Sequence, residues 1–373
     1  MTWILDEQRR MLRDSAQSFI GERLPVAHGR QLRDSADPLG YSVDAWRAFG
    51  EQGYAATLLP EAFGGLGLGV CEAGLIAEQL GHTLAPTPFL GTAVLAGWLL
   101  SKAGNEAQQQ AWLPRVAAAQ VVLALAVDEG PKHRPQTLAT TAVRDDDGWR
   151  LDGHKRFVVD GHGADALIVA AQAADGVALL LVPTDAAGLS VERLSMVDAR
   201  NAARVSLAGV RVGDGALIGS VGQGRELLDG VLDVGRAVLA SELVGLADEV
   251  FERTVAYLQQ RRQFGQLIGG FQALQHRAAE LFCDLELARA LVRQAQAALD
   301  AGTPDAARLV AQAKARAGLS ATRAVQEGVQ MHGGIGMTDE LDIGLFMKRA
   351  RVLNELWGDP HFHQDAFASS TGY

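Results

Sequence analysis

The chain has 373 residues, 48% of them hydrophobic and 21% charged, and a formal net charge of −10 at pH 7. This length allows a large core and two or three domains. No run of about 20 apolar residues occurs, so we expect no membrane span. The acidic balance, with arginines scattered along the chain, argues against nucleic acid as a partner.

The first ten residues lack the apolar core of a signal peptide and carry acids that transit peptides avoid. We therefore expect no targeting segment and a cytoplasmic location. The two cysteines, Cys71 and Cys283, are too few and too far apart for a disulfide framework or a metal cluster. We interpret both as buried small hydrophobic residues and expect no metal site.

Helical patterns fill residues 6 to about 117, with Asp6 as a plausible N-cap. Prolines at 38, 60, 86 and 88 divide this region, which predicts a bundle of several short helices. The stretch from Leu59 to Gly69 carries four glycines in six positions, and we interpret it as a loop between helices.

The pattern changes near Val121 to short apolar runs rich in β-branched residues, which indicates strands. Asp145 to Gly148 reads as a hairpin turn. The predicted strands are residues 121–127, 157–159, 166–169, 177–182 and 205–207. Their spacing favours a small β-barrel or sandwich.

Beyond Gly219 the pattern is helical again. An apolar stripe at alternating spacings of three and four runs from Phe271 to Leu299 and predicts one long helix with partners. The predicted partner helices are 225–261, one opened by Thr303-Pro304-Asp305, and 343–356. Helices, then strands, then helices give an α+β fold: an N-terminal helical domain (1–118), a central β domain (119–218) and a C-terminal four-helix bundle (219–373).

The stretch from Arg261 to Gln272 lies between two of the long helical patterns. A planar guanidinium such as that of Arg261 can make paired hydrogen bonds to a pyrophosphate. Gln263 and Gln272 offer amides, and Phe264 can cover an apolar ring edge. We expect these side chains to bind a dinucleotide. The alternative is a plain turn between helices with Arg261 in solvent.

A second motif, Gln330-Met331-His332-Gly333-Gly334-Ile335-Gly336, ends another helical pattern. Its glycines would let backbone amides approach a phosphate closely. The alternative is a helix that ends at a glycine, which is common. Because both motifs occur in order after a β domain, we favour binding by Gln330, Gly333 and Gly334.

These two motifs, the helix–strand–helix order and the Pro60-Glu61…Gly64-Gly65 loop resemble the acyl-CoA dehydrogenase family over the whole chain. The resemblance implies FAD as cofactor, bound partly by a neighbouring subunit. It implies α,β-dehydrogenation of an acyl-CoA thioester to the trans-2-enoyl-CoA, in acyl-CoA catabolism, with electrons passed to an electron-transferring flavoprotein. It also places Phe157 and Val159 at the flavin, where the family often has Trp-x-Thr or Trp-x-Ser.

The resemblance fails at the catalytic base. The family's commonest base, a glutamate, corresponds to Trp357, and a second family position corresponds to Gly235 before Arg236. Two carboxylates could substitute for it. Glu242 lies two helical turns beyond Gly235, where it could equally be a structural acid paired with an arginine, and Asp359 lies two residues beyond Trp357.

Two functions therefore remain open. The chain is either a complete acyl-CoA dehydrogenase, as a homo-oligomer with a displaced base, or an FAD-binding subunit that lacks the base and assembles with a homologous dehydrogenase chain. A flavin oxidase or monooxygenase and a helical scaffold without flavin are weaker alternatives. The acyl chain is not indicated by the sequence.

Overall fold

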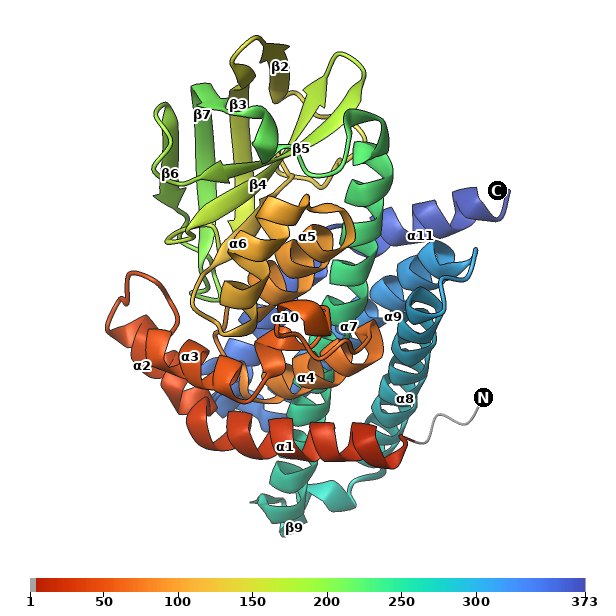
Figure 1. Cartoon of the computed structure of the whole chain (residues 1–373). Helices are drawn as coiled ribbons and strands as arrows, with labels where there is room; N and C mark the ends of the chain where they lie inside the picture. Colours follow the sequence, from red (N-terminus) through yellow and green to blue (C-terminus); the bar gives the residue numbers. More distant parts are fainter. Residues whose placement is uncertain (1–4, 373) are drawn as a thin grey trace. The chain divides into compact units, whose positions relative to one another are not determined.

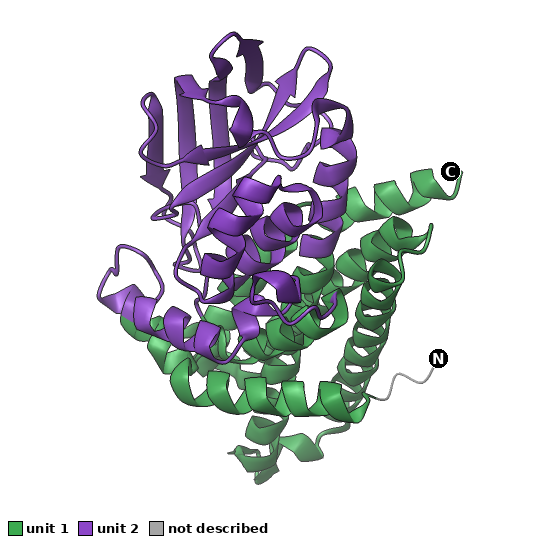
Figure 2. Cartoon of the chain, in the orientation of Figure 1, with its two compact units in different colours: residues 1–31, 70–85, 236–373 green, residues 32–69, 86–235 purple. Residues whose placement is uncertain are grey.

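A computed structural model describes residues 5–372 of the chain. Figure 1 shows its elements, and Figure 2 shows that it divides into two compact units, each described here by itself. Unit 1 comprises residues 1–31, 70–85 and 236–373, and unit 2 comprises 32–69 and 86–235. The predicted boundaries after residues 118 and 218 stay a prediction. Of the ten N-terminal residues used to predict the lack of a targeting segment, 1–4 lie outside the described residues.

Unit 1 is helical. Its helices are α1 (Glu7–Arg23), the first part of α2 (Val26–Asp34), α4 (Val70–Thr83), α7 (Gly224–Gln260) from residue 236, α8 (Gln272–Asp300), α9 (Ala306–His332), α10 (Ile343–Glu355) and α11 (Pro360–Ser370). The Asp6 side chain accepts a hydrogen bond from the Arg9 backbone N–H, which confirms the predicted N-cap. Within the described residues, no helix is both long and apolar enough to cross a bilayer.

The central part of the predicted stripe on α8 is buried, whereas Phe271, Leu274, Ala278 and Leu299 towards its ends are only partly buried. Leu281, Leu285, Ala288 and Val292 are each at most 2% exposed. Asp284, next to this stripe, accepts hydrogen bonds from two arginines of α9, so that ion pairs flank the apolar contact between α8 and α9. Our interpretation of both cysteines as buried is wrong: Cys283 on α8 is exposed, and Cys71 on α4 is only partly buried.

Helix α11 was missed because its sequence has little apolar periodicity. The signal was present in its first residues: Asp359 accepts a hydrogen bond from the Phe362 backbone N–H, and Pro360 occupies the first helical position. An Asp-Pro pair suits a helix start, because proline needs no hydrogen-bond acceptor there. The C-terminal part therefore contains α11 in addition to the predicted bundle helices.

Unit 2 combines helices with one mixed, seven-stranded sheet (Figures 1 and 2). Its helices are α3 (Val43–Glu51), the π-helical η3 (Phe89–Ala96), α5 (Gly97–Ala103) and α6 (Glu106–Ala117), and it includes the first residues of α7. The strands are β1 (Leu123–Ala126), β2 (Thr141–Asp145), β3 (Gly148–Val159), β4 (Ala166–Ala173), β5 (Gly176–Pro183), β6 (Leu189–Arg193) and β7 (Ala202–Val212).

The strand order is β1-β4-β2-β3-β7-β6, with β5 also paired to β4. The predicted hairpin is confirmed, since Asp145 pairs with Gly148 where β2 turns into β3. The α+β class is confirmed, with a single curled sheet as the central β part.

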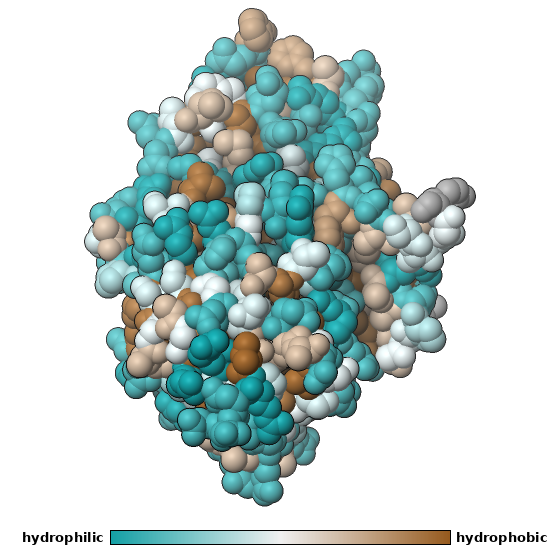
Figure 3. All heavy atoms as spheres, turned by 90° about the horizontal axis from the view of Figure 1, so that it is seen from above, coloured by the Kyte–Doolittle hydropathy of each residue, from teal (hydrophilic) through white to brown (hydrophobic). Residues whose placement is uncertain are grey.

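On the face in Figure 3, apolar residues are scattered among hydrophilic ones, and single apolar side chains at a protein surface are common.

Candidate functional site

The first motif forms a tight hairpin directly after α7. Strands β8 (Arg262–Gln263) and β9 (Gln266–Leu267) are joined by Phe264 and Gly265, whose φ angles are 52° and 82°. Two consecutive positive φ angles give the turn that suits a two-residue hairpin. The turn holds the Phe264 side chain 92% exposed, so an aromatic ring projects from unit 1 into solvent.

The second motif ends α9. Gly333 has φ of 68°, which terminates the helix, and the 3-10 turn η7 (Gly333–Met337) follows. A Cβ added at Gly333 or Gly334 would meet no atom within 4 Å, so the backbone at both glycines is open. Gln330, three residues before Gly333, is exposed. A ligand can therefore approach the backbone here at close range.

A ring contact in unit 1 brings the two motifs together. Tyr257, in the last turn of α7, stacks on His332 at the end of α9, with ring centroids 4.4 Å apart and an interplanar angle of 30°. The Nδ1 of His332 lies 2.7 Å from the Gly328 carbonyl. Burial lowers the pKa of His332, so the neutral ring, which donates from Nδ1, is favoured. We call residues 261–272 and 330–337 together the motif corner.

Four side chains predicted to bind a cofactor lie exposed at the motif corner: Arg261, Gln263, Gln272 and Gln330. Among residues 5–372, none of their side chains has a hydrogen-bond or ion-pair partner. Several other arginines of unit 1, such as Arg289, are held by carboxylates. Unpartnered amides and a guanidinium beside open glycines can bind an anionic ligand with several hydrogen bonds.

An ionic chain supports the motif corner from inside unit 1. His82 Nδ1 lies 3.4 Å from Glu249 Oε2, and the same carboxylate accepts from Arg253 at 2.6 Å. Arg253 and Arg30 both bind Asp342, each at 2.8 Å. Because Asp342 lies between η7 and α10, this chain fixes the segment that follows the second motif.

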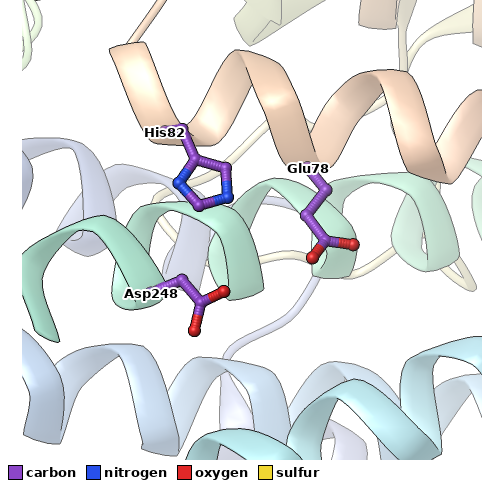
Figure 4. Close-up of side chains that lie close together, drawn as sticks. All are labelled: Glu78, His82 and Asp248. Carbon is purple, nitrogen blue, oxygen red and sulfur yellow. The ribbon is translucent and has the colours of Figure 1, made fainter. Parts of the chain in front are cut away.

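Glu78, His82 and Asp248 form a cluster with the residue types of a metal site (Figure 4). Arg289 donates hydrogen bonds to both Glu78 and Asp248, so a guanidinium already balances these carboxylates. Burial opposes the charging of His82, but Glu249 and the neighbouring carboxylates raise its pKa. The protonated ring that this favours does not bind a metal, and we interpret the cluster as an ion-pair network.

In unit 2, the predicted flavin residues Phe157 and Val159 lie at the end of β3. The pairing of β3 with β7 shifts register between Lys155 and Val158, and Phe157 has φ of 52°. This bulge turns the Phe157 side chain outward, to 36% exposure, while Val158 stays buried. Bulges of this kind commonly aim a side chain beside a binding site.

A buried ion pair lies behind this bulge. Lys155 Nζ is 2.7 Å from Glu129 Oε1, and Glu129 also accepts hydrogen bonds from the Ala139 and Thr140 backbone N–H groups. Burial opposes ionisation of Glu129, but these contacts lower its pKa to about 2. Burial lowers the pKa of Lys155 as well. We interpret the pair as charged, because the Glu129 carboxylate accepts hydrogen bonds from three donors, one of them the Lys155 ammonium group.

A surface cavity of about 220 Å³ lies beside the loop that follows Glu129. Its lining includes Lys132 and Arg134. The loop is braced by a contact of 2.7 Å between His133 Nδ1 and Asp128 Oδ1. Glu129 and Gly130 thus line a cavity together with two cationic side chains, Lys132 and Arg134.

Both candidate bases have structural partners. The Glu242 carboxylate accepts from Arg349 at 2.8 and 2.7 Å, and its side chain is 8% exposed. Asp359 accepts from the Phe362 N–H as the N-cap of α11. Trp357, at the family's base position, is 3% exposed. A catalytic role for Glu242 or Asp359 stays a prediction.

Lys314 and a role for Arg236 were not predicted from the sequence. Both are buried, and both donate to backbone carbonyls around Trp357. A lysine within an apolar helical face at 314 was the available signal, because buried lysines are rare unless they have partners. Tyr257, which joins the motifs, carries no signal of its own in the sequence.

Three family models match the chain in succession: the acyl-CoA dehydrogenase N-terminal domain at residues 6–120, the middle domain at 124–210 and the C-terminal domain at 222–368. The acyl-CoA dehydrogenase IpdE2 of Mycolicibacterium smegmatis is 31% identical, over 95% of this chain and 96% of its own.

Two solved structures extend this comparison. A variant of the Tcur3481-Tcur3483 steroid ACAD is 29% identical with a TM-score of 0.90, covering 97% of each chain. The ChsE4-ChsE5 complex of Mycobacterium tuberculosis has a TM-score of 0.92 at 24% identity, covering 100% of this chain and 99% of that one, and shares the fold.

Proposed function

The chain belongs to the acyl-CoA dehydrogenase family of flavoprotein oxidoreductases, and on this basis we propose that it is an FAD-binding subunit of a heteromeric acyl-CoA dehydrogenase. The reaction is α,β-dehydrogenation of an acyl-CoA thioester to the trans-2-enoyl-CoA, with electrons passed to an electron-transferring flavoprotein. A homologous chain supplies the base. We further propose a cytoplasmic location, on the sequence grounds given above.

This proposal depends on the observation that both candidate bases, Glu242 and Asp359, are already bound by other groups of the chain. A general base must reach the substrate's α-proton with a free carboxylate oxygen. Glu242 is bound by Arg349 within unit 1, and Asp359 caps α11. Removing Glu242 from its pair would leave a largely buried guanidinium uncompensated, which costs about 3–5 kcal/mol. We therefore assign structural roles to Glu242 and Asp359.

The residues of the motif corner fit FAD. Arg261 supplies an unpaired cation for a pyrophosphate, Gln263 and Gln330 supply amides, and Gly333 and Gly334 leave backbone open to a ligand. In unit 2, Phe157 projects from its bulge and Val159 follows it, which suits the edge of a planar ring. FAD, when bound, supplies the acceptor for the substrate's β-hydride.

Exposed apolar side chains at the motif corner support a partner chain. Phe264 is 92% exposed, Met337 74%, Ile335 42% and Leu267 36%. Large apolar side chains gathered on one surface commonly mark a protein interface. A partner there would cover Phe264 and could present its own flavin to Arg261. Among the compared proteins, the ChsE4-ChsE5 complex pairs two differently named chains.

The test is anaerobic titration with a panel of acyl-CoA thioesters that includes a steroid thioester, chosen because the Tcur3481-Tcur3483 enzyme is a steroid ACAD. The chain is purified alone and after co-expression with a homologous dehydrogenase chain. We expect flavin in the complex, bleaching by one class of thioester, and reduction of electron-transferring flavoprotein by the complex only. Bleaching by the chain alone would instead establish a complete enzyme with a displaced base.

A further inference from the structure

A buried lysine holds the turn between α10 and α11. Lys314, on α9, is 1% exposed, and its Nζ lies 3.0 Å from the Leu353 carbonyl oxygen and 3.2 Å from those of Asn354 and Gly358. These three carbonyls belong to one turn, residues 353–358. A single ammonium group thus binds the turn at both of its ends.

A second buried cation binds the middle of the same turn. Arg236 Nε donates to the Trp357 carbonyl at 3.0 Å, and its guanidinium lies over the Phe362 ring at 5.5 Å. Trp357 has φ of 52°, in the left-handed region that bulky residues avoid. Such a conformation persists only where its surroundings enforce it. Lys314 and Arg236 together hold four carbonyls around this residue.

We propose that Lys314 is a positioning residue that clasps the 353–358 turn when protonated and loosens it when neutral, so that the placement of residue 357 depends on pH. An ammonium group has three N–H donors, one for each of its three carbonyls. A neutral amine has two donors and a lone pair. On deprotonation, one carbonyl therefore loses its hydrogen bond and faces the lone pair.

The surroundings of Lys314 bring this change into the neutral range. Burial is the main cause that lowers the pKa of Lys314 to about 7, and the charge of Arg236 on α7 adds to it. Glu355 on α10 and Asp359 before α11 act in the opposite direction. The buried His363 on α11 lies against Gly358 of the same turn.

This inference goes beyond the proposed function and does not depend on flavin or on a partner chain. Position 357 is where the family resemblance places the base. In this chain the position is Trp357, and Lys314 and Arg236 bind the backbone of the turn that carries it. The Lys314 ammonium group is taken up by the three carbonyls, so we assign it a role through the turn. The conformation of the 353–358 turn is therefore the quantity to measure.

The experiment follows the fluorescence of Trp357 from pH 5.5 to 9 in the full chain, as the difference between wild type and Trp357→Phe. We expect one step with a midpoint near pH 7, and greater access of acrylamide to Trp357 above it. Lys314→Arg keeps donors and charge and should remove the step while keeping the low-pH signal. Lys314→Met should show the high-pH signal throughout.

Glu355→Gln provides a second, milder variant. Loss of this carboxylate should move the midpoint to lower pH, because Glu355 favours the charged lysine. The proposal is overturned by a flat wild-type profile, by an unchanged midpoint in Glu355→Gln, or by a step that persists in Lys314→Arg and so belongs to His363. Circular dichroism at each pH checks that every variant is folded.

Discussion

The ring of Tyr257 stacks on the ring of His332, with 4.4 Å between their centroids, and this contact joins the last turn of α7 to the last turn of α9. Arg261 follows Tyr257 by four residues, and Gly333 follows His332 directly. One aromatic contact therefore joins two motifs that lie about 70 residues apart in the chain. The position of each motif therefore depends on a contact that involves Tyr257, a residue outside both motifs.

The stack should be measurable as a coupling energy. In a double-mutant cycle with Tyr257→Leu and His332→Asn, we expect about 0.5–1.5 kcal/mol of coupling in the free energy of unfolding, the usual value of a ring pair. Urea unfolding at pH 7.5 measures it. Flavin affinity should fall in each single variant. Additive stability effects would show that the rings are neighbours without a shared role.

Arg261 should contribute to flavin binding through its free guanidinium. Arg261→Ala should weaken FAD binding about 10- to 100-fold, the loss of a charged hydrogen bond worth roughly 1.5–3 kcal/mol. Fluorescence quenching of FAD by the apo-complex measures this affinity. Arg47→Ala is the matched control, because Arg47 is also exposed but lies in unit 2 near Asp44. If Arg261→Ala and Arg47→Ala had the same flavin content and the same assembly, Arg261 would have no role in flavin binding.

The Glu129–Lys155 pair should make unit 2 sensitive to acid. The pKa of Glu129 is lowered to about 2, below the ordinary 4.5, so its contribution is present above pH 4.5 and is lost as pH falls toward 2. Glu129→Gln should remove this part of the pH dependence and lower the free energy of unfolding at pH 7 by about 3–5 kcal/mol, as for other broken buried pairs.

Glu192→Gln is the control for that experiment. Its ion pair with Arg204 is exposed, and exposed pairs contribute about 0–1 kcal/mol. Urea midpoints between pH 2.5 and 7 should therefore shift in Glu129→Gln and stay near wild type in Glu192→Gln. Parallel curves for wild type and Glu129→Gln over the acid range would contradict the assignment of a charged pair.

The sequence allowed the long elements to be predicted because their signals are local. The stripe around Leu281 and Leu285 repeats with the helical period, and Asp145 to Gly148 carries a turn signal between two strands. The two motifs of the motif corner could also be recognised, since Arg261 and Gly333 each follow a long helical pattern, but the contact that brings them together could not. Local patterns of this kind depend on neighbouring residues only, so they can be read without knowing the tertiary contacts.

Contacts between distant residues could not be predicted in this way. The pairing of Glu242 with Arg349 spans 107 residues, and the binding of Lys314 to Gly358 spans 44. Each depends on how helices cross, which no local spacing encodes. From its place in the sequence, Glu242 suits either a base or a structural acid, and only the position of Arg349 favours the structural acid.

Glu242 and Arg349 offer the sharpest test of whether this chain carries its own base. If the pair is structural, Glu242→Gln and Arg349→Met should both lower the free energy of unfolding by about 3–5 kcal/mol, because each leaves a partner buried and uncompensated. The double variant Glu242→Met/Arg349→Met should recover much of that loss. Turnover per folded, flavin-loaded complex should stay within about threefold of wild type in all three.

A base at Glu242 predicts a different pattern. Turnover would fall at least about 100-fold in both variants that lack Glu242, the usual lower range for loss of a general base, and would survive in Arg349→Met. Unfolding curves and stopped-flow flavin reduction on the same preparations separate the two patterns.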